Sequence, residues 1–497
     1  MKIQLNQRKT YVRRIIIFLL IYAFYGALIK PHYATDTYAV FFNSDNGALQ
    51  SARYVTYCFL KIMDFMKINV VRTQSIWTAA SILLLAHVTN MLIDRMLKIF
   101  RIDEFNMTYI ILVIACLFSV VNISVLEWFL FPEVIFPYVL GIYLAIKAVL
   151  MFDDNTSLTK EYIITPILVF LSIATYQVNL CFFITFATII AVLHNQMIFR
   201  KQCIVKIMQI WLMGAICGCI DILAQHIINK AQKVVSSERE ASITISSIWK
   251  NIVDILSQQR EIFLKGSELI GPWLLILCIG IVITLIICMY KTDLLTKLVI
   301  SILLVGIYCV SYIFAIASPF IWLSPRVLIG IYIAISAAII ICTAFAQQNG
   351  SQKAMSLLLF IMITFASALY TNGNDIIAEH YINNAVDQEY ARQIYNAISQ
   401  YENEIGIEVH TISVADDGEI AWKNNGVRKM AYNVNERAFL NSWSDVTLIN
   451  FVSNREFIRS EMQNEEKNKF FQVENWNQFN ADKQLYFEGD TLYWIKY

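Results

Sequence analysis

Residues 327–346 read VLIGIYIAISAAIIICTAFA and contain no charged side chain. A helix of about 20 apolar residues crosses the hydrocarbon core of a bilayer, which is about 30 Å thick. Ten further apolar runs occur in the chain, so we predict about 11 transmembrane helices. The runs cover residues 14–29, 74–98, 106–123, 131–152, 162–175, 177–194, 205–228, 272–290, 296–316, 327–346 and 354–370.

The composition of the chain supports the same conclusion. Hydrophobic residues make up 57% of its 497 residues and charged residues 15%, whereas a soluble protein carries about 25% charged residues. The first apolar run continues into an aromatic segment without a small-residue cleavage site, so it does not resemble a cleavable signal peptide. We therefore predict a mostly α-helical, polytopic membrane protein.

Charge is distributed unevenly between two parts of the chain. Residues 371–497 hold 20 acidic and 11 basic side chains, a net charge of −9, and the first 370 residues carry a net charge of +10. We predict a transmembrane domain at residues 1–370 and a small, acidic, water-soluble α/β domain at residues 371–497.

The pattern inside the C-terminal domain alternates between helix and strand. Residues 387–404 have the spacing of a helix, and residues 485–497 predict a hairpin that turns at Gly489 and Asp490. Two more segments, IEVHTISVA at 407–415 and VTLINFV at 446–452, are predicted as strands.

Basic residues in the connectors favour a cytoplasmic N-terminus. The short connectors that would then be cytoplasmic carry several Lys and Arg residues, whereas the short outer connectors carry only Arg326. Two longer outer segments, 30–73 and 229–271, also contain basic residues and oppose this assignment in part. Within them we predict an interfacial helix at residues 54–68 and one or two amphipathic helices at 229–271. An odd number of crossings then places the C-terminal domain outside.

Polar and aromatic side chains gather at the predicted outer ends of the helices. Ionisable groups at membrane ends are costly to bury and are usually functional. Capping of a helix or contact with lipid headgroups can explain each residue singly, so their convergence carries the argument. The candidates are His32, Asp36, Tyr38, Asp45, Arg53, Glu127, Glu133, Tyr176, Gln177 and Arg326.

These residue types fit sugar transfer from a lipid phosphate. Arginine makes paired hydrogen bonds to a phosphate, so Arg53 and Arg326 are candidate phosphate ligands. A neighbouring carboxylate can act as general base on an acceptor hydroxyl. The aromatic residues around Asp36 would stack on a sugar ring or hold a polyprenyl chain; they are Tyr33, Tyr38, Phe41 and Phe42.

Four stretches carry a resemblance to a known family. They are HYATDTYAVFFNSDNGALQSARYV at 32–55, EWFLFPEVIFPYVLG at 127–141, LSIATYQVNL at 171–180 and LSPRVLIG at 323–330. Over roughly residues 10–370 the chain resembles the bacterial membrane glucosyltransferases of the Gtr type II family.

The resemblance implies the multi-span GT-C type of fold in the bacterial plasma membrane. It implies a polyprenyl-phosphate sugar as donor and a cell-surface polysaccharide as acceptor, with reaction on the outer face. It also implies an acidic catalytic residue in the first outer loop, which is Asp36 here, and Asp45 competes for the role. The family's Gly-Arg pair appears in this chain as Ala52-Arg53.

We accordingly predict a hexosyltransferase without a cofactor, and no cluster of metal-ligating residues in the sequence argues for a metal. The catalytic candidates are Asp36, Asp45 and Glu127. The substrate-binding candidates are His32, Tyr38, Arg53, Glu133, Tyr176, Gln177 and Arg326. Expected partners are the lipid-linked donor, the polysaccharide acceptor, membrane lipids, a flippase and a polyprenyl-phosphate sugar synthase, with no nucleic acid.

Two alternative functions stay open. A polysaccharide polymerase or another glycan-assembly protein would also have many crossings and arginine-bearing outer loops, although acids in the first outer loop favour the transferase. A lipid or solute transporter would place ionisable groups inside the bilayer. Its candidates, His87, Asn90, Asp94, Asp221 and His226, are equally explained as polar contacts between helices.

The tryptophans of the C-terminal domain also have two interpretations. Trp422, Trp443, Trp476 and Trp494 would suit stacking on carbohydrate, or they form the core of a small domain. Motifs for nucleotide binding or metal-dependent hydrolysis, such as a P-loop or HExxH, do not occur in the sequence.

Overall fold

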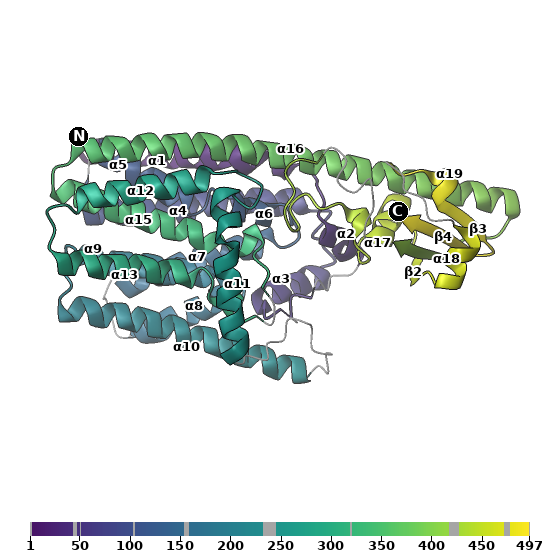
Figure 1. Cartoon of the computed structure of the whole chain (residues 1–497), viewed down its shortest axis with the longest axis horizontal. Coiled ribbons are helices and arrows are strands. Elements are labelled where there is room, and N and C mark those ends of the chain that lie inside the picture. The colour runs from purple at the N-terminus through teal and green to yellow at the C-terminus, as the bar shows by residue number, and fades with distance from the viewer. Residues whose placement is uncertain are drawn as a thin grey trace.

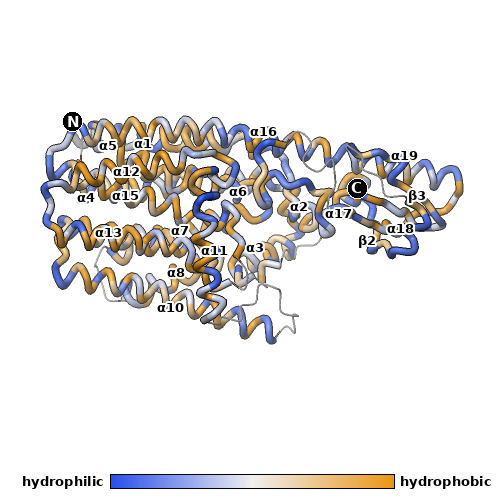
Figure 2. The backbone as a smooth tube through the Cα atoms, viewed as in Figure 1, coloured by the Kyte–Doolittle hydropathy of each residue, from blue (hydrophilic) through white to orange (hydrophobic). Residues whose placement is uncertain are grey.

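A bundle of long helices continues at one end into a small unit that contains a β-sheet (Figure 1). The N-terminus lies at the opposite end of the bundle (Figure 1). Hydrophobic residues follow the bundle helices, and hydrophilic residues dominate the sheet-containing unit (Figure 2). The computed structural model describes residues 2–42, 47–49, 51–102, 105–153, 159–231, 245–318, 321–416, 427–471 and 478–496.

Each of the predicted apolar runs lies on a helix. By length and composition, seven described helices can cross a membrane, or eight if the bent pair α5 and α6 forms one span. The chain is therefore a membrane protein with several apolar helices, and eleven crossings remain a prediction. The bundle helices are α1 (Lys2–Tyr25), α4 (Gln74–Phe100), α5 (Met107–Phe118), α7 (Ile135–Asp153), α8 (Thr165–Ile173), α9 (Leu180–His194), α10 (Lys201–Ala231), α12 (Trp273–Cys288), α13 (Leu294–Val310), α15 (Ile329–Gln348) and α16 (Gln352–Ile405).

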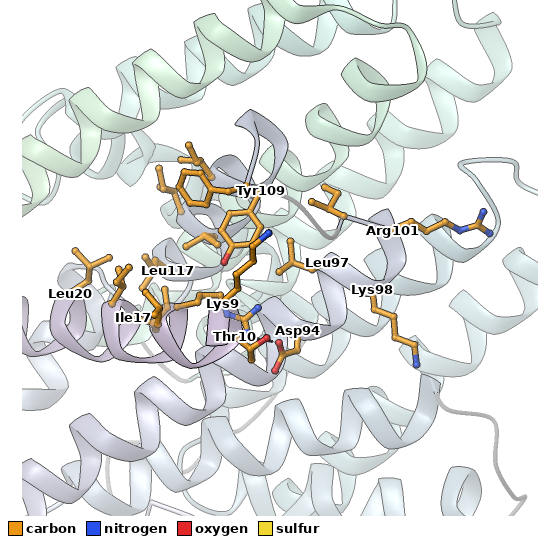
Figure 3. A pocket seen from close by; sticks show the side chains of 18 residues that line it. Lys9, Thr10, Ile17, Leu20, Asp94, Leu97, Lys98, Arg101, Tyr109 and Leu117 are labelled. Atoms are coloured by element: carbon orange, nitrogen blue, oxygen red, sulfur yellow. Dashed lines mark hydrogen bonds and ion pairs between the residues drawn. The ribbon is translucent and has the colours of Figure 1, made fainter. Parts of the chain in front are cut away.

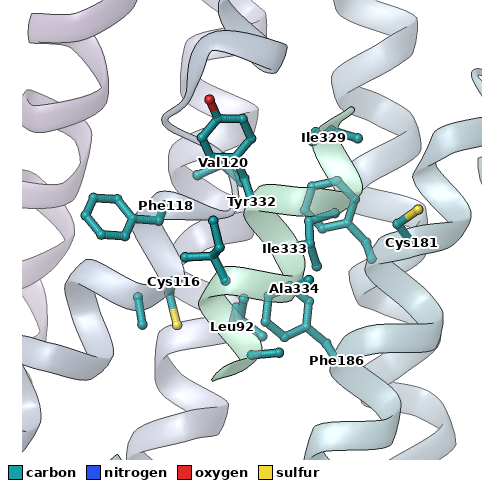
Figure 4. Packing of buried hydrophobic residues seen from close by; sticks show 14 of the residues in the cluster. Leu92, Cys116, Phe118, Val120, Cys181, Phe186, Ile329, Tyr332, Ile333 and Ala334 are labelled. Carbon is teal, nitrogen blue, oxygen red and sulfur yellow. The ribbon is translucent and has the colours of Figure 1, made fainter. Parts of the chain in front are cut away.

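The stretch quoted at the start forms α15, which runs through the middle of the bundle. Nearly all of its side chains are buried. A helix that is apolar on every face is stable only when neighbouring helices or lipid surround it. Figure 4 shows Tyr332 and Ile333 of α15 among Leu92 of α4, Phe118 of α5 and Phe186 of α9.

Shorter helices connect the bundle helices, mainly at the end that carries the sheet. The interfacial helix predicted at residues 54–68 forms as α3, and one amphipathic helix forms within 229–271 as α11. The connecting elements are η1 (Gly26–Ile29), α2 (Thr35–Phe42), α3 (Tyr54–Phe65), α6 (Ile123–Phe129), η2 (Lys160–Ile164), η3 (Gln177–Asn179), α11 (Ile245–Leu264), α14 (Ile313–Ile316) and η4 (Pro325–Val327).

Helix α16 is 54 residues long and leaves the bundle without interruption. Its last part is the helix predicted at residues 387–404, which is thereby confirmed. The predicted boundary between residues 370 and 371 lies inside this helix, and the division into two domains stays a prediction.

The C-terminal unit, which comprises the described residues from 406 to 496, holds a four-stranded sheet with the order β2-β1-β4-β3. Strand β1 pairs in parallel with β2 and β4, and β3 and β4 form the predicted hairpin around Gly489. The elements of the unit are β1 (Thr411–Asp416), η5 (Ala438–Leu440), α17 (Asp445–Ser453), β2 (Ile458–Glu461), α18 (Asn464–Phe470), α19 (Ala481–Gln484), β3 (Leu485–Glu488) and β4 (Thr491–Lys496).

The strand predicted at residues 446–452 is wrong, because this segment is helix α17. Val446, Leu448 and Ile449 are all buried, and Val446 and Ile449 are three residues apart, which is helical spacing. Short apolar runs do not distinguish a strand from a buried helix by periodicity alone. Strand β2, with the sequence IRSE, lacks the apolar alternation that would have predicted it.

Candidate active site

One cavity lies at the N-terminal end of the bundle, away from the predicted site. It has a volume of about 1010 Å³ and opens between α1, α4 and α5 (Figure 3). Its lining includes Asp94, which contacts both Arg13 and Arg14. The polar contact between helices is therefore the better explanation of Asp94, and this cavity contains none of the predicted site residues.

A second cavity, of about 380 Å³, collects predicted substrate-binding residues from distant parts of the chain. Arg53 lies just before α3, Tyr176 and Gln177 lie between α8 and α9, and Arg326 belongs to η4. The cavity lies at the bundle end that faces the C-terminal unit. It is also lined by Asp221 and His226 of α10, which the sequence analysis interpreted mainly as helix contacts.

Arg53 is held by aromatic rings but has no acidic partner among the described residues. Its Nη1 donates a hydrogen bond of 2.8 Å to the Tyr138 hydroxyl. Its guanidinium lies 4.7 Å from the centre of the Tyr176 ring, which stacks on Tyr138 with centroids 4.6 Å apart. Its Nε is buried without a hydrogen-bond partner. A half-buried, permanent positive charge beside a cavity is stabilised by an anion, so Arg53 is a candidate anion-binding position.

The backbone around Arg53 explains how it reaches this place. Ala52 adopts a φ of 56°, in the left-handed region that favours glycine. Gln177 Nε2 donates to the Ser51 carbonyl at 2.7 Å, and Val55 N donates to the Ala174 carbonyl at 2.9 Å. These bonds fasten the segment to the α8–α9 connector.

Close packing of α7 places the connector and its tyrosine. A Cβ atom on Gly141 would lie 2.0 Å from Thr175 Oγ1 and 2.1 Å from Asn179 Nδ2, so only glycine fits. Ser172 Oγ also donates to the Gly141 carbonyl at 2.8 Å. The connector therefore lies directly on α7, which brings Tyr176 against Tyr138.

Glu127 positions Arg326 on the other side of the cavity. The buried Glu127 carboxylate accepts a hydrogen bond from the Arg326 backbone N–H and lies 3.7 Å from Arg326 Nε. Trp128 Nε1 donates to the Arg326 carbonyl at 3.0 Å. The structure thus engages Glu127 with an arginine, and its predicted catalytic role stays a prediction.

Asp36 lies in the first turn of α2, where it interacts electrostatically with the carboxyl groups of Glu133 and Glu436. The next residue, Thr37, donates a hydrogen bond of 2.9 Å to Glu133 Oε2. Glu133 is buried in the connector between α6 and α7, outside the helix that can span the membrane, and burial raises its pKa to about 8, to which the Asp36 charge adds. At neutral pH Glu133 is mainly protonated. Asp36 also interacts electrostatically with Arg326, which connects it to the cavity.

Two predicted binding residues occupy packing positions. Tyr38 is almost completely buried, and its ring contacts Tyr33 and Phe451 of α17. His32 is fully buried, and its two ring nitrogens lie 2.9 Å from the Lys30 and Phe129 carbonyl oxygens. These contacts indicate structural roles. Asp45, the competing base, lies outside the described residues.

Sequence reasoning missed the contribution of the C-terminal unit to this site. Trp443 Nε1 donates a hydrogen bond of 3.1 Å to Asp36 Oδ1. Glu436 interacts electrostatically with Asp36 and Arg326. The only sequence signal was the possible exposure of the tryptophans: Trp443 is exposed and Trp494 is a core residue, whereas Trp422 and Trp476 lie outside the described residues.

The region around the site matches a known family. The sequence model of glucosyl transferase GtrII matches residues 25–330. The chain belongs to the GtrII family. In this GtrII member the matched region contains every residue predicted for the site and ends at the start of α15, so the C-terminal unit lies beyond it. No curated protein and no solved structure matches the chain. Groups of three metal-ligating side chains do not occur in the described part.

Proposed function

We propose that this GtrII member transfers a glucosyl or other hexosyl residue from a polyprenyl-phosphate sugar to a cell-surface polysaccharide. The reaction would take place on the outer face of the bacterial plasma membrane. Membership of the GtrII family supports glycosyl transfer. The observation that carries the choice of donor is Arg53, a half-buried cation without an acidic partner in the described structure, whose buried Nε has no hydrogen-bond partner and which lines a cavity at the end of apolar helices.

The two arginines would hold the donor phosphate. Arg53 has an unused Nε–H and Arg326 lies across the same cavity, with Glu127 fixing its orientation. Charge-assisted hydrogen bonds from arginine to phosphate are short and strong. They would stabilise the negative charge that develops on the phosphate as it leaves, which is the part of the transition state that needs stabilisation.

Asp36 would act as the general base. The acceptor hydroxyl attacks the anomeric carbon of the donor sugar, and its proton passes to the Asp36 carboxylate. The bond between the anomeric carbon and the phosphate oxygen breaks, and polyprenyl phosphate leaves with the electron pair. Asp36 Oδ2 has no hydrogen-bond partner among the described residues, so this oxygen is available to accept the proton.

The arrangement of the chain supports a site on one side of the membrane. Helix α2 packs against α17 of the C-terminal unit through Tyr33, Phe41 and Phe451. The first outer loop and the C-terminal unit therefore share a side, opposite to the N-terminus (Figure 1). Basic residues in the connectors at the N-terminal end, such as Lys98 and Arg101 in Figure 3, favour the cytoplasm for that end.

The test compares membranes that contain wild-type protein or Asp36→Asn. They are incubated with radiolabelled polyprenyl-phosphate glucose and polysaccharide from cells without the gene. We expect Asp36→Asn to lower the transfer rate by about 10²–10⁴-fold, the usual contribution of a positioned base. Asp64→Asn, the same change at an exposed position of α3, is the matched control and keeps full activity.

Two further measurements complete the test. Asp45→Asn decides between the two aspartates of the first loop. The length distribution of the polysaccharide separates side-branch transfer from polymerisation, because a branch transferase leaves chain length unchanged. Full transfer by Asp36→Asn at wild-type protein levels would contradict the assignment of the base.

A further inference from the structure

The segment that carries Glu436 is fastened to α16 by buried polar contacts. Asn435 Nδ2 donates to the Ile376 carbonyl at 3.1 Å, and Asn383 Nδ2 donates to the Asn435 carbonyl at 2.8 Å. Arg437 forms a buried ion pair with Asp387, whose second oxygen accepts from Ala438 N at 2.7 Å. Because both neighbours of Glu436 are fixed in this way, its backbone position is well determined.

Glu436 lies between these anchors on the side of the active site. Burial raises the pKa of its carboxyl group, a hydrogen bond with the Asn441 side chain lowers it, Asp36 adds to the increase, and Arg326 opposes it. The carboxyl group therefore interacts electrostatically with both the proposed base and a proposed phosphate ligand. Glu436 comes 400 residues after Asp36 in the chain.

Trp443 combines an exposed ring with a fixed backbone. It precedes α17, where Ser444 Oγ donates to the Ala438 carbonyl at 2.6 Å and Asp445 N donates to the Asn441 carbonyl at 2.9 Å. The Asp445 carboxylate is itself buried between Lys496 and Arg459. The Trp443 side chain is nevertheless 51% exposed, although its N–H is bound to Asp36.

We propose that the C-terminal unit forms the acceptor subsite, in which a sugar ring of the acceptor polysaccharide stacks on Trp443 and hydrogen-bonds to Glu436. The inference rests on the proposed function, because it takes Asp36 as the base that the acceptor hydroxyl must reach.

The chemistry of the three side chains fits a carbohydrate. An aromatic face covers the apolar C–H face of a hexose, and a carboxylate accepts hydrogen bonds from its hydroxyl groups. The Trp443 N–H occupies Asp36 Oδ1 and leaves Oδ2 open. A hexose on the indole would therefore lie beside the open oxygen, with the donor phosphate held on the other side by Arg326.

The proposed donor and acceptor ligands come from different parts of the chain. The proposed donor ligands Arg53 and Arg326 come from the bundle, whereas Trp443 and Glu436 come from a unit outside the GtrII match. A separate acceptor module lets acceptor specificity change without disturbing the donor site.

A binding experiment on the full-length protein in lipid nanodiscs tests the subsite without turnover. In an Asp36→Asn background, the probe is polysaccharide purified from cells without the gene, and its dissociation constant is measured by calorimetric titration. We expect Trp443→Ala to weaken binding about 10-fold or more. Tryptophans that a ligand covers on binding often contribute a large part of the binding free energy. Trp443→Phe keeps a ring and has a smaller effect. Tyr486→Ala, which removes an exposed aromatic ring on β3, is the matched control and leaves binding unchanged.

A kinetic experiment separates stacking from simple positioning of Asp36. In otherwise wild-type protein, Trp443→Ala and Glu436→Gln should raise the acceptor KM about 10-fold and leave the donor KM unchanged. A lower kcat with unchanged acceptor KM would show that Trp443 only orients Asp36 and would overturn the proposal, as would unchanged acceptor binding. Thermal unfolding of each variant confirms that it is folded, with Trp443→Phe as the milder substitution.

The two hypotheses fail in different ways. Transfer by Asp36→Asn would remove the proposed base whatever the effect of Trp443 on binding. Loss of transfer in Asp36→Asn, together with acceptor binding that is indifferent to Trp443, would leave the transferase intact and exclude the acceptor subsite.

Discussion

Arginine residues at the two ends of the helical bundle have different kinds of partner. At the N-terminal end, Arg13 and Arg14 contact Asp94, and Arg95 contacts Asp153, which also lies 2.9 Å from His194 Nε2. These ion pairs join α1, α4, α7 and α9. At the end near the C-terminal unit, Arg53 contacts aromatic rings and has no acidic partner in the described structure.

The difference indicates which charged residues stabilise the fold and which are available to bind a ligand. A buried ion pair broken by removal of one partner leaves an uncompensated charge, so the N-terminal pairs hold the bundle together. An unpaired buried cation costs free energy in the absence of ligand, and a bound phosphate recovers it. The carboxyl groups of Asp36, Glu133 and Glu436 are likewise concentrated at the second end.

The largest effect that tests this comparison is expected at the N-terminal end. Asp153→Asn removes the carboxylate from the largely buried Arg95–Asp153 ion pair and should lower the free energy of unfolding by about 3–5 kcal/mol. Denaturation in detergent measures the loss, and Asp64→Asn is again the exposed control. The kcat/KM of the folded fraction should not change. A variant that is as stable as wild type would show that the pair contributes nothing to stability.

The next largest effect is expected at Arg53. Arg53→Gln should raise the donor KM by roughly 10–100-fold, because the neutral side chain loses its charge-assisted hydrogen bonds to phosphate. Stability should stay the same or rise, since a half-buried charge without an acidic partner among the described residues has been removed. Arg53→Lys should recover only part of the donor affinity, because lysine lacks the planar fork. An unchanged donor KM in Arg53→Gln would exclude Arg53 from donor binding.

The smallest effect at neutral pH is expected at Glu133. Its pKa of about 8 means that it is protonated below that pH and ionised above it. Ionisation would add a negative charge beside Asp36 and repel the anionic donor, so wild-type activity should fall above pH 8. Glu133→Gln mimics the protonated form and should keep activity at pH 7 within about 3-fold, without the alkaline decline. The same decline in both proteins would show that another group causes it.

The membrane helices were predictable because a bilayer imposes a simple rule on the chain. Each helix must present an apolar surface along its whole length, so runs such as 327–346 are visible in the sequence. The small sheet follows weaker rules. Helix α17 was mistaken for a strand, because the partners that bury its Val446 and Leu448 are set by tertiary packing.

The site was predictable to the extent that it uses residues at helix ends. Arg53, Tyr176, Gln177 and Arg326 are separated in sequence but line one cavity, since outer helix ends must meet at the same membrane face. Tyr38 does not line this cavity, because its ring packs against Phe451 from the C-terminal unit, and its predicted role in binding stays a prediction. Trp443 was one of four candidate tryptophans and Glu436 was not a candidate, and neither could be placed beside Asp36, because only the folded chain brings them there.

The uninterrupted helix α16 determines how the C-terminal unit is placed relative to Asp36. A helix of 54 residues is about 80 Å long and has no hinge. It therefore connects the C-terminal unit rigidly to the bundle. Each residue added to a helix advances the unit by about 1.5 Å and also turns it by about 100° around the axis. Length and angle therefore cannot change independently. The loops of this chain tolerate insertions of any size more readily, whereas in α16 even one extra residue would turn Trp443 away from Asp36.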